Sequence, residues 1–192
     1  MTSTTRPLTL AEYLEYDDGT DTRYELVAGE LVIMPPESDL NNAIAILLMF
    51  ALGQVVSPRL LRRGTEIVVA GARASSRLPD LIVLTEELAT LLRGASRSAI
   101  LLDMPPPALV VEVVSPGREN EDRDYRYKRS EYAARGIPEY WIVDPIQSQV
   151  VILTLVSGFY EPFTFRGGDR LLSPMFPDLN LTASEVLQAE IG

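Results

Sequence analysis

The segment Leu109–Val114 carries a glutamate, Glu112, inside an otherwise apolar run, and this combination limits the possible folds more than any other feature. Such a run does not alternate between apolar and polar residues, which is typical of a β-strand covered on both faces. An unpaired carboxylate is costly to bury, so a stable fold must compensate it. We therefore expect Glu112 to meet an arginine, a metal ion or a proton.

The hydrophobic pattern around this strand predicts a single α/β domain over residues 1–192, with residues 1–8 flexible. The expected helices are 10–16, 41–56, 85–93, 122–135 and one that begins after Thr182. The expected strands are a hairpin over 24–34, then 65–70, 80–84, 109–114, 140–143, 150–156 and an edge strand near Phe163. The helix over 122–135 would join parallel neighbouring strands by a right-handed crossover.

Composition excludes several kinds of chemistry. The sequence has no histidine and no cysteine, which removes imidazole catalysis, thiol nucleophiles, disulfides and metal sites with nitrogen or sulfur ligands. The net charge of -10 repels nucleic acid at long range, so a polyanion would need a local basic patch. No signal peptide is recognisable, and the longest apolar run, residues 43–52, is shorter than the about 20 residues of a membrane span. We expect a cytoplasmic protein without a membrane segment.

Asp80 raises the same question as Glu112, because it opens the apolar strand Leu81–Leu84. If the two strands are neighbours, Asp80 and Glu112 converge and offer oxygen ligands for Mg²⁺ or Mn²⁺, with Glu25 as a third acid. The alternative is structural: Glu112 forms a salt bridge with an arginine, and Asp80 serves only as a turn or cap residue.

Lys128 is the only lysine among the 17 basic residues. At 100° per residue, Tyr125, Lys128 and Tyr132 lie on one helix face, so the lysine shares a face with two rings that pack inward. An ammonium beside two carboxylates could position or deprotonate a water molecule, which a guanidinium does poorly. The alternative is an ordinary surface lysine whose stem lies along apolar surface.

These residues, together with their surroundings, resemble the Uma-two family of restriction-endonuclease-like proteins in the PD-(D/E)XK nuclease superfamily. The resemblance extends over nearly the whole chain and is carried by Pro79-Asp80, Glu112, Val113-Val114-Ser115-Pro116-Gly117, Asp122 to Tyr132, and Gly136 to Pro145. It implies a restriction-endonuclease-like α/β core, a mixed β-sheet flanked by helices, with an added N-terminal helix and hairpin. It also implies Asp80 and Glu112 as Mg²⁺ ligands and Glu25 as an auxiliary acid.

The sequence departs from the superfamily pattern in one catalytic position. Glu-X-Lys is expected on the strand, but Glu112 is followed by Val113 and Val114. The resemblance offers Lys128 as a lysine that has moved to the next helix while its ammonium reaches the same site. A histidine usual in the family before the apolar helix is also missing, with Asn41 near that position.

The expected function is Mg²⁺-dependent (or Mn²⁺-dependent) hydrolysis of phosphodiester bonds in nucleic acid, as a DNA endonuclease. Asp80, Glu112 and the Val113 carbonyl would hold the metal ion and Lys128 would position the water. Nucleic acid backbone contacts are expected from Arg77, Arg126 and Arg129, and by family analogy the protein would be a homodimer. One alternative is a non-catalytic scaffold of the same fold that binds a protein partner, and a weaker one is a two-carboxylate glycosidase.

Overall fold

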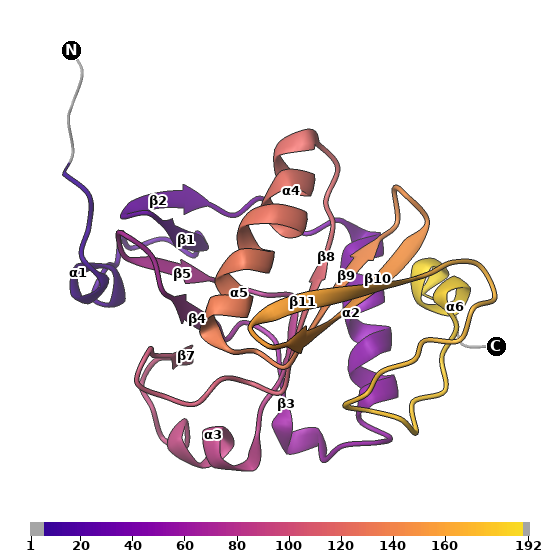
Figure 1. Ribbon diagram of the computed structural model, residues 1–192. Coiled ribbons are helices and arrows are strands. Elements are labelled where there is room, and N and C mark those ends of the chain that lie inside the picture. The colour runs from indigo at the N-terminus through magenta and orange to yellow at the C-terminus, as the bar shows by residue number, and fades with distance from the viewer. Residues whose placement is uncertain (1–5, 190–192) are drawn as a thin grey trace.

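A computed structural model describes residues 6–189 and shows two mixed β-sheets flanked by helices (Figure 1). The larger sheet has six strands in the order β11-β10-β9-β8-β6-β3. Their bounds are β3 Leu61–Arg62, β6 Leu81–Val83, β8 Leu109–Val113, β9 Glu139–Asp144, β10 Gln149–Val156 and β11 Phe159–Phe165. The α/β fold class expected from the sequence is confirmed.

The second sheet has five strands in the order β2-β1-β5-β4-β7. Their bounds are β1 Tyr24–Val27, β2 Glu30–Ile33, β4 Glu66–Val69, β5 Ser75–Arg77 and β7 Ala99–Ile100. The expected hairpin is present as β1 and β2, which pair in antiparallel orientation. The sequence pattern did not predict β3, β5 and β7, because these strands are two or three residues long and give no periodic signal of their own.

The strand that carries Glu112 is central, as expected. All five residues of β8 are buried, with β9 parallel on one side and β6 antiparallel on the other. β10 then pairs with β9, and β11 is the edge strand of the sheet.

Helices cover both faces of the six-stranded sheet. The helices within residues 6–189 are α1 Leu10–Leu14, α2 Asp39–Leu52, α3 Glu86–Leu91, α4 Arg118–Asp122, α5 Arg129–Arg135 and α6 Ala183–Gln188, with a short 3-10 turn, η1, at Pro58–Leu60. The capping boxes expected at Thr9 and Thr182 are both formed. Within residues 6–189, no helix combines the length and the apolar character needed to cross a membrane.

The helix before β9 begins earlier than the sequence suggested and is not uniform. It was expected to begin at Asp122, but α4 begins at Arg118, and a π-helical segment, η2 (Arg123–Lys128), joins α4 to α5. Gly136 ends α5 in the left-handed conformation, with a φ of 77°. A π segment widens one turn of a helix, and such segments are frequent at functional sites.

Two apolar clusters show how the helices pack. Residues 109, 111 and 113 of β8 face α2 and α6, whereas residues 110 and 114 lie in the cluster that contains Tyr132 of α5. Glu112 therefore projects from the face that α5 covers.

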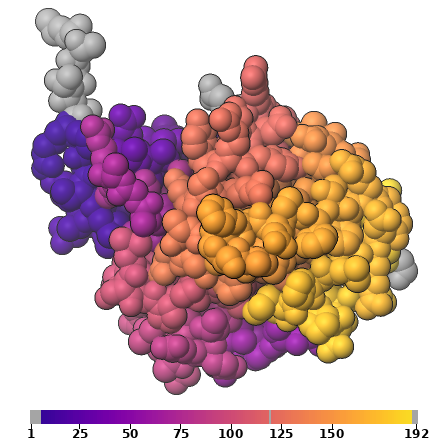
Figure 2. Space-filling model, viewed as in Figure 1, coloured from indigo at the N-terminus to yellow at the C-terminus, as the bar shows by residue number. Residues whose placement is uncertain are grey.

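Figure 2 shows the N-terminal segment at one side of the molecule and the C-terminal segment at the other. Flexibility was expected for residues 1–8, of which residues 1–5 lie outside the described range. Leu8 N donates to the Gly29 carbonyl at 2.8 Å.

Candidate active site

The sheet brings Asp80 and Glu112 together, as the sequence suggested. Leu81 pairs with Val111 in antiparallel register, so the next position places Asp80 beside Glu112. The Val113 main-chain N–H donates to Asp80 Oδ2 at 2.6 Å. This bond ties the Asp80 carboxylate to the strand that carries Glu112.

Lys128 lies under its helix and contacts three carboxylates. Its Nζ is 2.7 Å from Glu112 Oε2, 3.3 Å from Asp124 Oδ1 and 3.6 Å from Glu25 Oε1, and its side chain is 1% exposed. It is therefore no surface lysine, and the partner of Glu112 is this ammonium rather than an arginine. The inward direction follows from the shared helix face with Tyr132, which is fully buried.

Tyr132 completes the environment of Glu112. Its hydroxyl donates to Glu112 Oε1 at 2.7 Å, while Lys128 donates to Oε2. Both carboxylate oxygens thus have a donor, and Glu112 does not line either cleft described below. The open pair of flanking carboxylates that a glycosidase needs is therefore not formed by Asp80 and Glu112.

Arg77 is buried in a second part of the same cluster. Its Nη1 is 3.1 Å from Glu25 Oε2, and its Nε and Nη2 donate to Glu131, each at 2.7 Å. Glu25 also accepts from Leu78 N at 3.1 Å. With its side chain 3% exposed, Arg77 supports Glu25 and does not present its guanidinium to a nucleic acid backbone. Burial of Arg77 therefore does not fit the backbone contact predicted for it.

The cluster holds more negative than positive charge. Its five carboxylates belong to Glu25, Asp80, Glu112, Asp124 and Glu131, and its three cations to Arg77, Arg123 and Lys128. With every group ionised, two negative charges have no counter-charge inside the cluster. A buried excess of this kind favours uptake of protons or of a cation.

The pKa values respond to this excess. Burial raises the pKa of Asp80 to about 6, although the charge of Lys128 opposes the change. Burial also raises the pKa of Glu112; the charge of Lys128 opposes this, and the neighbouring acids reinforce it. For Lys128, burial lowers the pKa, but the surrounding carboxylates outweigh burial and leave the pKa raised, so that the ammonium persists at neutral pH. Burial opposes ionisation of Glu25 too, yet the adjacent cations lower its pKa overall.

Two carboxylate oxygens remain available for a ligand. Asp124 Oδ2 is buried and has no hydrogen-bond partner, and Asp80 Oδ1 accepts no hydrogen bond from residues 6–189. Unpartnered oxygens and surplus negative charge suit a hard divalent cation, which prefers oxygen ligands. Within the described range, no three acidic side chains converge closely enough to form a metal site by themselves. The carbonyl of Val113, an expected ligand, faces Asn41 Nδ2 at 3.4 Å.

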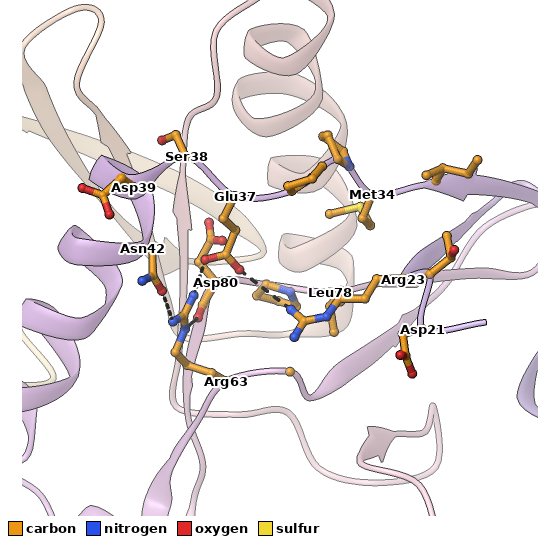
Figure 3. A pocket seen from close by; sticks show the side chains of 16 residues that line it. Asp21, Arg23, Met34, Glu37, Ser38, Asp39, Asn42, Arg63, Leu78 and Asp80 are labelled. Carbon is orange, nitrogen blue, oxygen red and sulfur yellow. Dashed lines mark hydrogen bonds and ion pairs between the residues drawn. The ribbon is translucent and has the colours of Figure 1, made fainter.

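Asp80 connects the cluster to an open cleft of about 930 Å³ (Figure 3). The cleft lies between the end of the β1–β2 hairpin, the start of α2 and the segment before β6. Its lining consists of Asp21, Thr22, Arg23, residues 33–39, Asn42, Arg63, Gly64, Leu78, Pro79 and Asp80. A smaller cleft of about 280 Å³ adjoins it and shares Thr22, Arg23, Gly64 and Leu78.

The other predicted backbone contacts lie away from this cleft. Arg126 is 70% exposed and pairs with Asp122 at 3.3 Å, and Arg129 Nη2 donates to the Tyr160 carbonyl at 2.9 Å. Neither lines the cleft beside Asp80.

The sequence pattern did not single out Asp124, and it indicated Arg63 only as one of five arginines in the basic stretch of residues 57–79. Asp124 stands four residues before Lys128, and this i,i+4 spacing of opposite charges is a signal that could have found it. Arg63 has no comparable signal, because its partners lie at least 17 residues away along the chain.

Comparisons with known proteins identify the family and the fold of the chain. The model of the Uma2 (Uma-two) family, described as putative restriction endonuclease, matches residues 10–184. The crystal structure of a putative nuclease belonging to DUF820 from Anabaena variabilis ATCC 29413 is similar, with a TM-score of 0.71 and 18% sequence identity over 95% of this chain and 99% of that chain. No curated protein matches the chain. The structural likeness shows a shared restriction-endonuclease-like fold.

Proposed function

The chain belongs to the Uma2 family of putative restriction endonucleases, and we propose that it hydrolyses phosphodiester bonds of DNA with the help of Mg²⁺. The observation that carries the proposal is the excess of buried carboxylates next to an open cleft, with Asp80 in both. Without a functional role, an uncompensated excess of buried carboxylates would only weaken the fold.

Asp80 and Glu112 would hold the cation, with Asp124 and the Val113 carbonyl as further oxygen donors. A bound Mg²⁺ or Mn²⁺ lowers the pKa of coordinated water and stabilises negative charge on phosphate oxygens. Asp80 is the residue that also faces the cleft, so it defines where the phosphate must approach.

Lys128 acts through Glu112. Because its pKa is raised, it is a poor general base, and its buried ammonium lies within 3.6 Å of three carboxylates. Its role is to favour the ionised form of Glu112 and to orient this carboxylate toward the metal position. Glu25 supports this arrangement from the other side, since it contacts both Lys128 and Arg77.

A cleavage assay tests the proposal. Supercoiled plasmid, linear DNA and RNA are incubated with the wild type, Asp80→Asn and Asp178→Asn, with Mg²⁺, with Mn²⁺ and with EDTA. The side-chain amide in Asp80→Asn keeps an oxygen that can accept the Val113 N–H, so the fold is retained while a charged ligand is lost. Asp178 is an exposed aspartate outside the cleft and serves as the matched control.

The proposal predicts metal-dependent cleavage by the wild type and Asp178→Asn and none by Asp80→Asn. Equal cleavage by Asp80→Asn would exclude this site. Absence of cleavage of every substrate with both metals would exclude the function. Cleavage of RNA alone would change the substrate class and leave the site in place.

A second candidate function is a scaffold that keeps the nuclease fold without catalysis. It is favoured by the fact that both oxygens of Glu112 already have protein donors, Lys128 and Tyr132. Calorimetric titration with Mn²⁺ separates the two functions, because a scaffold would bind no ion at Asp80. A homodimer, proposed from the family resemblance, is tested by light scattering after size-exclusion chromatography.

A further inference from the structure

Two arginines at the cleft converge on a single carboxylate. Arg63 Nη2 pairs closely with Glu37 Oε2, and Arg23 Nη1 lies 3.9 Å from Glu37 Oε1 (Figure 3). All three side chains line the cleft that Asp80 enters. Two arginines thus share the Glu37 carboxylate at the place where a phosphate must approach, in a cleft whose lining also carries Asp21, Asp39 and Asp80.

Arg63 is held in a fixed position by neutral groups. Its Nε donates to the Asp80 main-chain carbonyl at 3.1 Å, and its Nη1 donates to Asn42 Oδ1 at 2.7 Å. The guanidinium is therefore fixed beside the main chain of Asp80. A guanidinium fork of this kind matches the oxygens of a carboxylate or a phosphate.

Glu37 is held less firmly than Arg63. It belongs to the irregular segment of residues 34–38 between β2 and α2, and its side chain is 33% exposed. Within residues 6–189, its hydrogen bonds and ion pairs involve only the two arginines. Withdrawal of Glu37 would leave the anchored guanidinium of Arg63 without an anion.

We infer that Arg63, with Arg23 beside it, binds a backbone phosphate of the nucleic acid next to Asp80, and that Glu37 occupies this position in the free protein. A phosphodiester carries one negative charge and two non-bridging oxygens, so it can replace a carboxylate without changing the local charge. This inference rests on the proposed function and deepens it: it assigns phosphate binding to Arg63, which lines the cleft, whereas Arg77 is buried.

Salt dependence of binding distinguishes this role from a purely structural one. When a variant loses one cationic contact to a phosphate, the negative slope of log K against log salt becomes less steep, by about 0.9 for duplex DNA and about 0.7 for a single strand. Loss of a structural contact can weaken binding but leaves this slope unchanged.

The experiment measures binding of fluorescein-labelled duplex and single-stranded oligonucleotides by anisotropy in EDTA at several salt concentrations. The variants are Arg63→Gln, Arg63→Lys, Glu37→Gln and, as the matched control, Arg59→Gln. Arg59 lies in the same segment and pairs with Glu86 on the surface, outside the cleft. Metal-dependent cleavage by the wild type is measured in parallel.

For Arg63→Gln, we expect the slope of log K against log salt to become less steep by the contribution of about one phosphate. Arg63→Lys should keep the wild-type slope, and Arg59→Gln should bind as the wild type does. Glu37→Gln should bind about two- to fivefold more tightly, as expected from removal of one exposed competing charge. If the wild type cleaves DNA but Arg63→Gln and Arg59→Gln have the same slope, this inference is overturned and the proposed function stands. If the wild type neither binds nor cleaves nucleic acid, the proposed function fails and the inference fails with it.

Discussion

Replacing Lys128 by methionine tests the electrostatic account of the cluster directly. Methionine has a similar length and no charge, so Lys128→Met removes the ammonium without opening a large cavity. Glu112 then loses its 2.7 Å partner while its carboxylate stays buried. The charge excess of the cluster grows by one.

The expected cost is large. Breaking a buried ion pair by removing one partner costs about 3–5 kcal/mol, because the remaining charge is uncompensated. For a chain of this size, each kcal/mol corresponds to about 2–4 °C in Tm, so the predicted drop is on the order of 6–20 °C. The cost should grow as pH rises, because the folded variant favours a protonated Glu112, whose pKa is already raised in the wild type.

Urea denaturation of four proteins at pH 5 and pH 8 measures the effect: wild type, Lys128→Met, Glu112→Gln and the double variant. The glutamine in Glu112→Gln can still accept from the Tyr132 hydroxyl, so the double variant should recover much of the loss. A loss below about 1 kcal/mol for Lys128→Met, or a loss that does not depend on pH, would refute the reasoning.

Three further predictions concern the same cluster. Asp80→Asn should stabilise the metal-free protein at pH 7 by up to about 3 kcal/mol. The reason is that folding raises the pKa of Asp80 from 3.8 to about 6, so the stability that this carboxyl contributes below pH 4 is lost as pH rises through 6. Urea midpoints that shift equally at pH 4 and pH 7 would contradict this. Mg²⁺ at a hundredfold excess over its Kd should stabilise the wild type by about 2.7 kcal/mol in a thermal scan and leave Asp80→Asn unchanged, and equal shifts for both would place the ion elsewhere. Tyr132→Phe leaves Glu112 Oε1 without its donor and should cost about 1–3 kcal/mol by urea unfolding; an unchanged midpoint would show that Glu112 does not depend on this bond.

The sequence predicted those parts of the fold that local patterns determine. The apolar run around Glu112 indicated a central strand, and the capping boxes at Thr9 and Thr182 located two helix starts. The inward direction of Lys128 followed from helical spacing with Tyr132.

The parts that were missed depend on partners distant in the chain. Arg77 was expected to contact a nucleic acid backbone, but Glu25 and Glu131, more than 50 residues away, make its burial possible. Nothing near Arg77 in the sequence reveals these partners. Likewise, no local pattern indicates η2, in which the Asp124 carbonyl accepts from the hydroxyl of the distant Tyr140 at 3.0 Å.

The π-helical segment divides the acidic cluster between two structural units. Lys128 is the last residue of the segment and adjoins α5, which carries Tyr132, whereas Asp124 lies near the start of the widened turn. Deleting one residue there would restore ordinary α-helical winding and rotate α4 by about 100° relative to α5. Asp124 would swing away while the ammonium kept its place against the sheet. A single-residue deletion would therefore remove the unpartnered oxygen of Asp124 and leave that of Asp80 in place, which makes this turn a natural point for adjusting the ion-holding capacity of the protein in evolution or by design.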